Sequence, residues 1–323
     1  MILWRPLTSL ISLIVALVTF AGPGTAEKAT NDAYLNTLDR SGFFANTAAD
    51  AIPQTALHDV VLRHFEGPLP AGKTAKKCIV FGFDGARADV LFHSAGQKKS
   101  GIQALKADGG LVYQMYTGGK SPNLQLTKTA PGWTSMLTGQ WTRGHHVLFN
   151  GAMKGVYPLT LFTELVRKDL VRGTGFLVSW KTHFTNLIST YRIEKEYAKW
   201  KGYGSRMVWD CQPDDAGTAA ATLAMAKDTS AGQADFIFCI LEYCDHEGHS
   251  SGYGDQNPAY IQAFREADRD AYNILQAIQA RPGYAKEDWL ILFTSDHGGI
   301  NRNHGAQYAV ERQIYLASNK ALF

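Results

Sequence analysis

Five short apolar runs punctuate the chain from residue 76 onward, and each has the length of a β-strand. The runs are rich in Ile, Val, Leu and Phe, and they lack the strict alternation of apolar and polar positions that marks a strand with one wet face. They therefore predict strands that are covered on both faces. The runs are KKCIVFGF (76–83), GTGFLVSW (173–180), ADFIFCILEY (234–243), DWLILFTS (288–295) and RQIYLAS (312–318).

Segments with helical patterns lie between these runs. Residues 158–170 space their apolar side chains at three and four positions, residues 214–228 are rich in Ala, and residues 257–280 open with an Asn-Pro start signal. Strands that alternate with helices predict an α/β fold, a three-layer sandwich with a mostly parallel central sheet flanked by helices. No internal repeat interrupts the pattern, so we expect one domain over residues 76–323 after a partly helical lead-in over residues 27–75.

The first 26 residues have the pattern of a secretory signal peptide. One Arg precedes an apolar stretch, and small residues then lead to Glu27, so cleavage is expected after Ala26. The apolar stretch is shorter than the roughly 20 residues of a membrane span. We expect a secreted or periplasmic protein with no membrane span in its mature chain, and an uncleaved membrane anchor is the alternative.

Charge and cysteine content bear on nucleic-acid binding and on disulfide formation. The net charge is +3 and no basic run stands out, so nucleic-acid binding is not expected. Four cysteines in an exported chain allow at most two disulfides, whose pairing the sequence does not decide. Cys78 and Cys239 lie inside apolar runs, and we expect them to be small buried hydrophobic residues.

Acidic and imidazole side chains follow three of the predicted strands. A single Asp-Gly after a strand is usually a turn. Ligand sites of α/β sheets, however, lie at the carboxyl ends of the strands, where three such clusters would meet. Asp and His without Cys suit zinc and related divalent ions, and two groups of them predict two ions. The residues are Asp84 after the first run, Asp245, His246 and His249 after the third, and Asp296, His297 and His304 after the fourth.

A candidate nucleophile lies in residues 127–139, TKTAPGWTSMLTG, where hydroxyls precede a predicted helix. The positive potential and free N–H groups of a helix N-terminus favour a phosphate at that position. A Thr that only caps the helix is the alternative.

With these residues in place, the chain resembles the alkaline phosphatase superfamily, most closely its nucleotide pyrophosphatase/phosphodiesterase-like branch. The likeness covers residues 76–318 and rests on the motifs FGFDG, TKTAPGWTSMLTG, HHVLFNG, DHEGHSSG and SDHGG, which occur in the family's order. The resemblance implies a metal-dependent hydrolase that cleaves phosphodiester or pyrophosphate bonds through a phospho-threonine intermediate.

The resemblance also implies a role for each of eight residues. Thr129 matches the nucleophile, and Asn150 matches the amide that holds a phosphoryl oxygen. Two further groups match the ligands of two divalent ions, for which zinc is the first candidate. The first group is Asp84, Asp296 and His297, joined by Thr129, and the second is Asp245, His249 and His304.

Two departures from this branch bear on the substrate. His304 follows Asp296 closely, without the long inserted segment of the nucleotide pyrophosphatases, and this spacing is more similar to the glycosylphosphatidylinositol ethanolamine-phosphate transferases. Ala130 stands where nucleotide-cleaving relatives carry an aromatic residue, for which Trp133, Trp180 or Tyr157 would have to substitute. We therefore expect a small-molecule, lipid or glycan phosphoester as the substrate.

Several alternatives stay open at this point. The chain could be a phosphoethanolamine-type transferase, a phosphomonoesterase, or an inactive extracellular binding module. A sulfatase would need Cys or Ser before x-Pro-x-Arg, and the chain has Thr129 to Gly132 there. Among the other polar residues, we expect His145 and His146 to position the Asn150 loop, Glu242 to support the metal ligands or to be structural, and His183 to lie in the pocket or at the surface.

Overall fold

Eight strands of the described chain form one sheet. The computed structural model describes residues 43–47, 49–151, 159–183 and 191–323, so the predicted signal peptide over residues 1–26 lies outside it. The strands lie in the order β1-β3-β8-β7-β2-β6-β4-β5. They are β1 (Ile52–Pro53), β2 (Ala75–Phe83), β3 (Leu111–Tyr116), β4 (Thr174–Val178), β5 (Met207–Cys211), β6 (Phe236–Leu241), β7 (Glu287–Thr294) and β8 (Gln313–Ser318).

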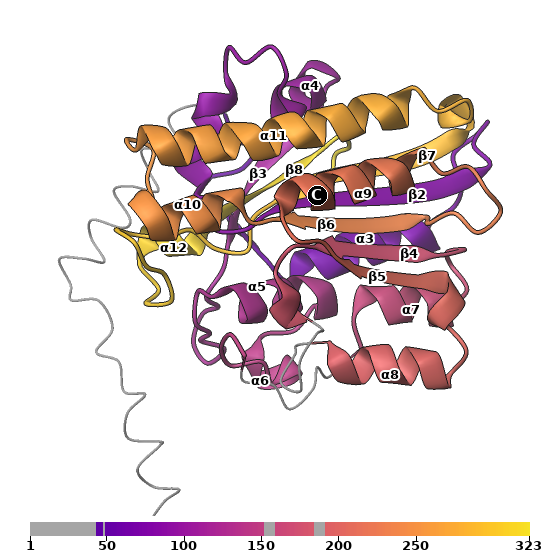
Figure 1. Ribbon diagram of the computed structural model, residues 1–323, viewed down its shortest axis with the longest axis horizontal. Helices are drawn as coiled ribbons and strands as arrows, with labels where there is room; N and C mark the ends of the chain where they lie inside the picture. The colour runs from indigo at the N-terminus through magenta and orange to yellow at the C-terminus, as the bar shows by residue number, and fades with distance from the viewer. Residues whose placement is uncertain (1–42, 48, 152–158, 184–190) are drawn as a thin grey trace, which may run out of the picture.

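The helices lie in two layers, one on each face of the sheet (Figure 1). The α-helices are α3 (Ala56–Glu66), α4 (Gly101–Ala107), α5 (Thr129–Thr138), α6 (Thr142–His145), α7 (Leu161–Arg167), α8 (Arg192–Trp200), α9 (Asp215–Lys227), α10 (Tyr243–Ser251), α11 (Pro258–Gln279) and α12 (Ala309–Arg312). Short 3₁₀ segments are η1 (Ala88–Ser94), η2 (Lys181–His183), η3 (Gly204–Arg206) and η4 (Tyr284–Lys286).

Both faces of the central strands are buried, as the apolar runs predict. In β2, Cys78 and Val80 join a core beneath α3, α5 and α7, whereas Ile79 and Phe81 join a second core beneath α9 and α11. Successive side chains of a strand point to opposite faces, so a strand between two helical layers needs apolar residues at both parities. This explains why β2 reads as a continuous apolar run.

The three-layer α/β prediction is confirmed, with a refinement at one side of the sheet. Strands β7, β2, β6, β4 and β5 are mutually parallel, whereas β8 runs antiparallel to both β7 and β3. The sequence patterns did not reveal β1, β3 or β5. Strand β5 lies at the edge of the sheet and is only partly buried, which gives it a weaker apolar signal.

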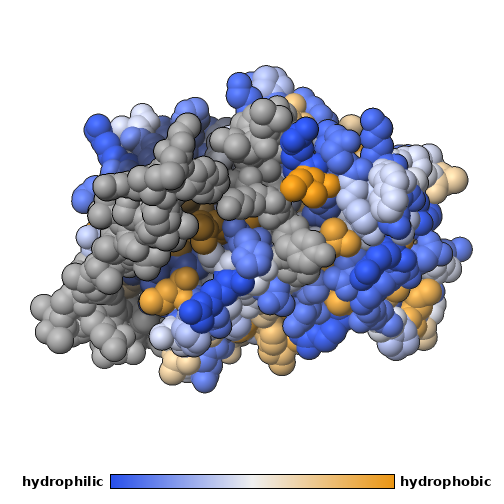
Figure 2. Space-filling view, turned by 90° about the horizontal axis from the view of Figure 1, so that it is seen from below, coloured by the Kyte–Doolittle hydropathy of each residue, from blue (hydrophilic) through white to orange (hydrophobic). Residues whose placement is uncertain are grey.

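The four cysteines are free thiols, and Cys78 and Cys239 are fully buried as predicted. Within the described ranges, no helix has both the length and the apolar character required to cross a membrane. The described surface seen from below is mainly hydrophilic, with scattered hydrophobic residues (Figure 2).

A network of charged side chains lies at the amino-terminal ends of β2 and β6, opposite the carboxyl ends of the strands. The Lys77 ammonium is 1% exposed and lies 2.9 Å from the Asp235 carboxylate. Asp235 also accepts hydrogen bonds from the Arg172 backbone N–H at 2.7 Å and its guanidinium at 2.6 Å. Because Asp235 directly precedes β6 and Lys77 lies near the start of β2, the network holds the two central strands in register at their origin.

We expect the Asp235→Ala variant to lose about 3–5 kcal/mol of unfolding free energy, because it leaves the Lys77 charge buried and unpaired. The matched control is Asp169→Ala, whose carboxylate pairs with Arg206 at the surface and is 86% exposed. Exposed pairs of this kind contribute at most about 1 kcal/mol. Urea unfolding measures both, and equal losses would contradict the structural role given to Asp235.

Candidate metal centre and active site

Three neighbouring strands deliver the candidate ligands to one edge of the sheet. Strand β2 is followed by Asp84, whose backbone N–H extends the ladder by bonding to the Leu241 carbonyl at 2.9 Å. Strand β6 leads into α10, which carries Asp245, and β7 is followed by Asp296. Helices α5, α10 and α12 gather at this end, at the left of Figure 1. The site lies where ligands of α/β sheets usually bind.

The inner triad consists of Asp84, Asp296 and His297, all fully buried. One ligand atom from each residue lies within 4.8 Å of the others. The His297 Nε2 atom is 3.6 Å from Asp84 Oδ1 and 3.3 Å from Asp296 Oδ2. The sequence had placed these residues together through the predicted meeting of strand ends and through the family resemblance.

Each carboxylate of the inner triad has one oxygen held and one without a partner. Trp133 Nε1 donates to Asp84 Oδ2 at 2.7 Å, and the Gly85 backbone N–H donates to Asp296 Oδ1 at 3.2 Å. The remaining oxygens, Asp84 Oδ1 and Asp296 Oδ2, have no hydrogen-bond partner among the described residues. Buried carboxylate oxygens are costly to leave unpaired, so two of them beside one imidazole fit the ligand set of a divalent cation.

The outer triad consists of Asp245, His249 and His304. Asp245 and His249 are four residues apart on α10 and therefore lie on the same side of the helix, as predicted. The two imidazole Nε2 atoms are 3.2 Å apart, and they lie 3.5 Å and 3.6 Å from the oxygens of Asp245. His304 is buried, whereas the His249 side chain is 43% exposed, so this triad borders solvent.

The histidine hydrogen bonds show which nitrogen atoms are available for a metal. The Nδ1 atoms of His297, His249 and His304 lie 3.0, 2.9 and 2.8 Å from backbone carbonyls, which can only accept. These contacts place the proton on Nδ1 and leave each Nε2 as a lone pair. In both triads, therefore, lone pairs of nitrogen face lone pairs of oxygen or of another nitrogen. Such acceptors repel one another unless a cation lies between them.

The pKa shifts of the buried ligands also fit a site for cations. Burial raises the pKa of Asp84, and the nearby Asp245 charge raises it further. Burial likewise raises the pKa of Asp296, followed by the charge of Asp84. Burial lowers the pKa of His297 and His304, which favours their neutral forms. These imidazoles therefore add no positive charge to balance the buried carboxylates. Carboxylate oxygens and neutral imidazoles at these positions fit two adjacent divalent cations.

Thr129 is the first residue of α5, and its hydroxyl lies beside the inner triad. Its Oγ1 is 3.4 Å from His297 Nε2, and the hydroxyl also interacts with Asp84. The helix dipole makes this position electropositive. Lys128, not Thr129, is the N-cap residue, so the capping alternative does not describe Thr129.

Asn150 contacts the same helix start. Its Oδ1 accepts a hydrogen bond from the Ala130 backbone N–H at 2.9 Å, which satisfies one of the free donors in the first turn. His145 lies behind this loop: its Nδ1 accepts from the Val147 N–H at 3.0 Å, and its Nε2 is 3.0 Å from the Ser135 hydroxyl. The loop contacts predicted for His145 are therefore present, while His146 is exposed.

Two glycines allow the close packing of these segments. Gly85 has φ +68°, and a Cβ there would lie 2.8 Å from Asp245 Oδ1. A Cβ at Gly132 in α5 would lie 2.9 Å from the Cβ atom of Asp296. Any side chain at either position would push strand ends or α5 apart, so the FGFDG and APGW motifs need glycine for steric reasons.

The sequence motifs did not reveal Glu311, which links the segment of Thr127 to the segment after His304 by hydrogen bonds. Glu311 is buried, and its Oε2 accepts hydrogen bonds from the Thr127 hydroxyl at 2.6 Å and from three consecutive backbone N–H groups at 3.2, 2.8 and 2.7 Å. Those N–H groups belong to residues 305–307, directly after His304. The Thr127 carbonyl also accepts the hydrogen bond from His304 Nδ1.

Two other residues near the centre differ from one of their sequence-based interpretations, and a third lies outside the described residues. His183 is fully buried and packs against the rings of Phe176 and Tyr191, so the surface alternative is wrong. Trp133 is also fully buried and bonded to Asp84, so it cannot stack on a substrate base. Tyr157, the third aromatic candidate, lies outside the described residues.

Tyr253 is a further residue that the motifs did not assign to the site, and Glu242 is one for which they left a supporting or a structural role open. The Tyr253 hydroxyl donates to Asp245 Oδ1 at 2.5 Å and thus orients an outer ligand. Glu242 forms a group with Asp84 and Asp245 that lies between the two triads, within 4.8 Å by ligand atoms. Only the folded chain brings these side chains to the site.

Comparison with known proteins gives one match over most of the chain. The sequence model of the family described as type I phosphodiesterase / nucleotide pyrophosphatase matches residues 78–318. None of the curated proteins matches the sequence.

Solved structures with a similar fold include an inactive variant of murine ectonucleotide pyrophosphatase/phosphodiesterase 5 in complex with AMP. It has 15% identity and a TM-score of 0.47, with 69% of this chain and 57% of that chain covered. Phosphonoacetate hydrolase from Sinorhizobium meliloti has 15% identity and a TM-score of 0.44, with 72% and 58% covered. A putative sulfatase from Bacteroides thetaiotaomicron has 12% identity and a TM-score of 0.47, with 76% and 64% covered. The chain thus spans less than two thirds of each of these structures.

We expect Glu311→Leu to weaken divalent-metal binding by about 10–100-fold, as is usual when a residue that orients a metal ligand is lost. The Thr127 hydroxyl and the N–H groups after His304 would lose their acceptor. Glu311→Gln retains an acceptor oxygen and should recover most of the affinity. Isothermal titration of the metal-free protein with Zn²⁺ measures the effect. Equal affinities for wild type and Glu311→Leu would contradict the positioning role.

Proposed function

The chain belongs to the type I phosphodiesterase / nucleotide pyrophosphatase family, as its motifs predicted, and from this premise we propose that it is a metal-dependent hydrolase of phosphodiester or pyrophosphate bonds. The observation that carries the proposal is the position of the Thr129 hydroxyl, which lies at a helix N-terminus and 3.4 Å from the Nε2 lone pair of the inner triad. A nucleophile, an electropositive helix end and two groups of metal ligands meet at one point.

Two divalent ions, for which zinc is our proposal, would be held by the two triads. Asp84, Asp296 and His297 would hold the first ion, and the Thr129 hydroxyl lies next to them. The outer triad would hold the second ion. When bound, two such ions lower the pKa of a nearby hydroxyl and neutralise charge on the attacking and leaving oxygens.

The residues of the chain perform the remaining tasks. Thr129 Oγ1 loses its proton and attacks phosphorus, and the bond to the leaving oxygen breaks. The leaving group takes up a proton and departs as an alcohol or a phosphate, while the other substituent stays on the phosphoryl group bound to Thr129. Water then cleaves the Thr129–phosphate bond, which restores the hydroxyl and releases a phosphate monoester. The N-terminus of α5 favours the negative charge that develops during both steps. Asn150, held through its Oδ1 by the Ala130 N–H, keeps its amide N–H donors for a phosphoryl oxygen.

The two triads differ in access, which orients the substrate. The inner triad is fully buried, whereas His249 of the outer triad is exposed. The reacting phosphorus therefore has to lie between Thr129 and the outer triad, with one ester substituent directed toward solvent. We also propose export of the chain, on the signal-peptide pattern of residues 1–26, and a catalytic domain over residues 76–323.

We expect Thr129→Ala to reduce kcat for a chromogenic diester, bis(p-nitrophenyl) phosphate, by more than about a thousandfold, since removing a nucleophile usually has such an effect. The bound metal should remain, because six other ligands are intact. Thr129→Ser retains a hydroxyl and should keep measurable turnover. A chelator should abolish wild-type activity, and p-nitrophenyl phosphate, the matching monoester, should react more slowly. Activity of Thr129→Ala near the wild-type level would exclude this nucleophile.

We expect His304→Ala to bind one divalent ion per chain in place of two, because the outer triad loses the buried imidazole that faces His249. His246→Ala is the control: His246 lies on the same helix as His249 but is exposed and belongs to neither triad. Metal content after dialysis, measured by plasma mass spectrometry, distinguishes them. Loss of metal from His246→Ala but not from His304→Ala would reverse the assignment of the outer ligands.

A further inference from the structure

A third group of possible ligand atoms lies between the two triads of the candidate metal centre. Asp84, Glu242 and Asp245 each offer a carboxylate oxygen, and these atoms lie within 4.8 Å of one another. The group shares Asp84 with the inner triad and Asp245 with the outer triad. The three groups therefore form a continuous series from the outer triad to the inner one, and Glu242 is the member that belongs to neither triad.

A cavity of about 520 Å³ gives solvent access to one end of this series. It lies at the carboxyl ends of β4, β5 and β6, and the residues that line it include Trp180, Asp215, Glu242, Asp245 and His249. The last two are ligands of the outer triad. Of the described residues in its lining, none belongs to the inner triad, whose three side chains are fully buried. An ion in the cavity therefore meets the outer triad and Glu242 first.

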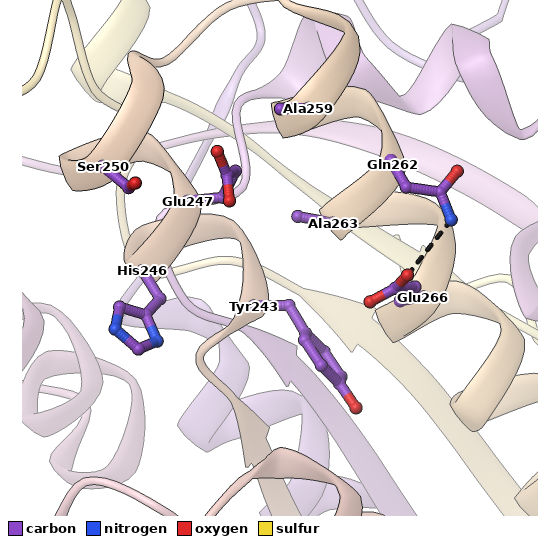
Figure 3. A pocket seen from close by; sticks show the side chains of 8 residues that line it. All are labelled: Tyr243, His246, Glu247, Ser250, Ala259, Gln262, Ala263 and Glu266. Atoms are coloured by element: carbon purple, nitrogen blue, oxygen red, sulfur yellow. Dashed lines mark hydrogen bonds between the residues drawn. The ribbon is translucent and has the colours of Figure 1, made fainter.

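Other approaches to the inner triad are closed in the described part of the chain. Thr129, which lies beside the triad, is 3% exposed, and Trp133, which is bonded to Asp84, is 0% exposed. A second cavity, of about 380 Å³, lies between α10 and α11 and contains none of the triad residues (Figure 3). The described residues thus leave the outer triad as the approach to the inner one.

The backbone of Glu242 is held in place, whereas its carboxylate has a buried oxygen without a partner. Glu242 directly follows β6 and is the N-cap residue of α10, and its backbone N–H donates to Asp215 Oδ1 at 2.9 Å. Its Oε1 atom is buried and has no hydrogen-bond partner among the described residues, and the same holds for Oδ1 of the fully buried Asp84. Buried carboxylate oxygens without donors are costly, so both atoms fit contact with a cation.

The charges of the centre match two divalent ions and leave a third without balance. Asp84, Asp245, Asp296 and Glu242 are the four carboxylates of the three ligand groups, and two divalent ions neutralise them when all are ionised. A third ion in the middle group would share Asp84 and Asp245 with its neighbours, and divalent cations so close together repel one another strongly. The position of Glu242 therefore suits an ion in transit and not one at rest.

We propose that Glu242 is a transfer ligand, which passes a divalent ion from the outer triad to the inner triad while the centre is loaded. The inference rests on the proposed function, since the two triads have to hold ions. The outer triad receives an ion from the cavity, the Glu242 carboxylate takes the place of an imidazole, and Asp84 then draws the ion inward. A second ion fills the outer triad afterwards. The inner ion is thus bound first and released last.

The rates of metal exchange test this transfer without any measurement of activity. Protein loaded with Zn²⁺ is mixed in a stopped-flow instrument with an excess of the chromogenic chelator 4-(2-pyridylazo)resorcinol. Release should show two phases, a fast one from the outer triad and a slow one from the inner triad. His304→Ala, which should hold only the inner ion, identifies the slow phase. Uptake by the metal-free protein is followed with a weak fluorescent zinc indicator.

Glu242→Gln should slow the inner phase of release by about tenfold or more, because an amide stabilises a divalent ion between the triads far less than a carboxylate does. Uptake at the inner triad should slow as well, and two ions should remain bound because every triad ligand is intact. The direction of the effect is diagnostic: loss of a resident ligand, or of a charge that only stabilises the bound ions, would speed release. Glu242→Asp retains a carboxylate and should recover part of the rate.

Asp214→Asn is the matched control. Asp214 lines the same cavity and belongs to none of the three ligand groups, so the variant removes one charge from the wall and no ligand. It also keeps the cap of α9, because Asn caps a helix as well as Asp. Its inner phase should stay within about twofold of the wild-type rate, since an exposed charge is screened by solvent and salt.

The outcomes separate the transfer role from the proposed function. Release from Glu242→Gln at or above the wild-type rate would overturn the transfer role and leave the two-ion centre intact. So would a third ion that wild type retains after dialysis and Glu242→Gln loses, since Glu242 would then be a resident ligand. Equal slowing in Asp214→Asn would assign the effect to the charge of the cavity wall and overturn the specific role. Wild-type protein that takes up no divalent ion would overturn both proposals.

Discussion

Acceptor atoms that face one another in a buried site are the constraint on which the rest of this structure depends. Asp84 Oδ1, Asp296 Oδ2 and His297 Nε2 all present lone pairs to the same small volume. Such an arrangement raises the free energy of the folded chain, so neighbouring contacts have to hold it. Trp133 and the Gly85 N–H each fix one carboxylate, and backbone carbonyls fix the imidazoles. Each of these contacts uses the carboxylate oxygen or imidazole nitrogen other than the one that the residue presents to the triad.

The central sheet supplies the rigidity that this arrangement requires. Strands β2, β6 and β7 are parallel neighbours, which places the residues after them side by side. Their origins are held by Lys77 and Asp235, far from the centre. At the functional edge, Glu311 fastens the loop of Thr127 to the residues after His304. The ligands, which come from the segments after β2 and β7 and from helix α10, are therefore held by contacts that reach well beyond the site.

Access, more than ligand identity, distinguishes the two triads. The inner triad lies beside the N-terminus of α5 and is closed to solvent, which would keep bulk water away from the nucleophile proposed at Thr129. The outer triad opens onto the cavity of Trp180, Asp215 and Glu242. The residues after β4 and β5 and at the start of α9 border the open triad, whereas those after β2 and β7 form the buried one.

Local patterns in the sequence determined the parallel core of the sheet, the long helices, and the residue types at the strand ends. The continuous apolar runs of β2, β6 and β7 require burial on both faces, and the motifs that contain Asp84, Thr129 and His297 stand directly after strands or before a helix. Only the tertiary structure decided which atoms face which. Glu311 meets Thr127 across 184 residues, and Trp133 meets Asp84 across 49. Contacts of this kind leave no period in the sequence, because they arise when elements that are distant along the chain pack together.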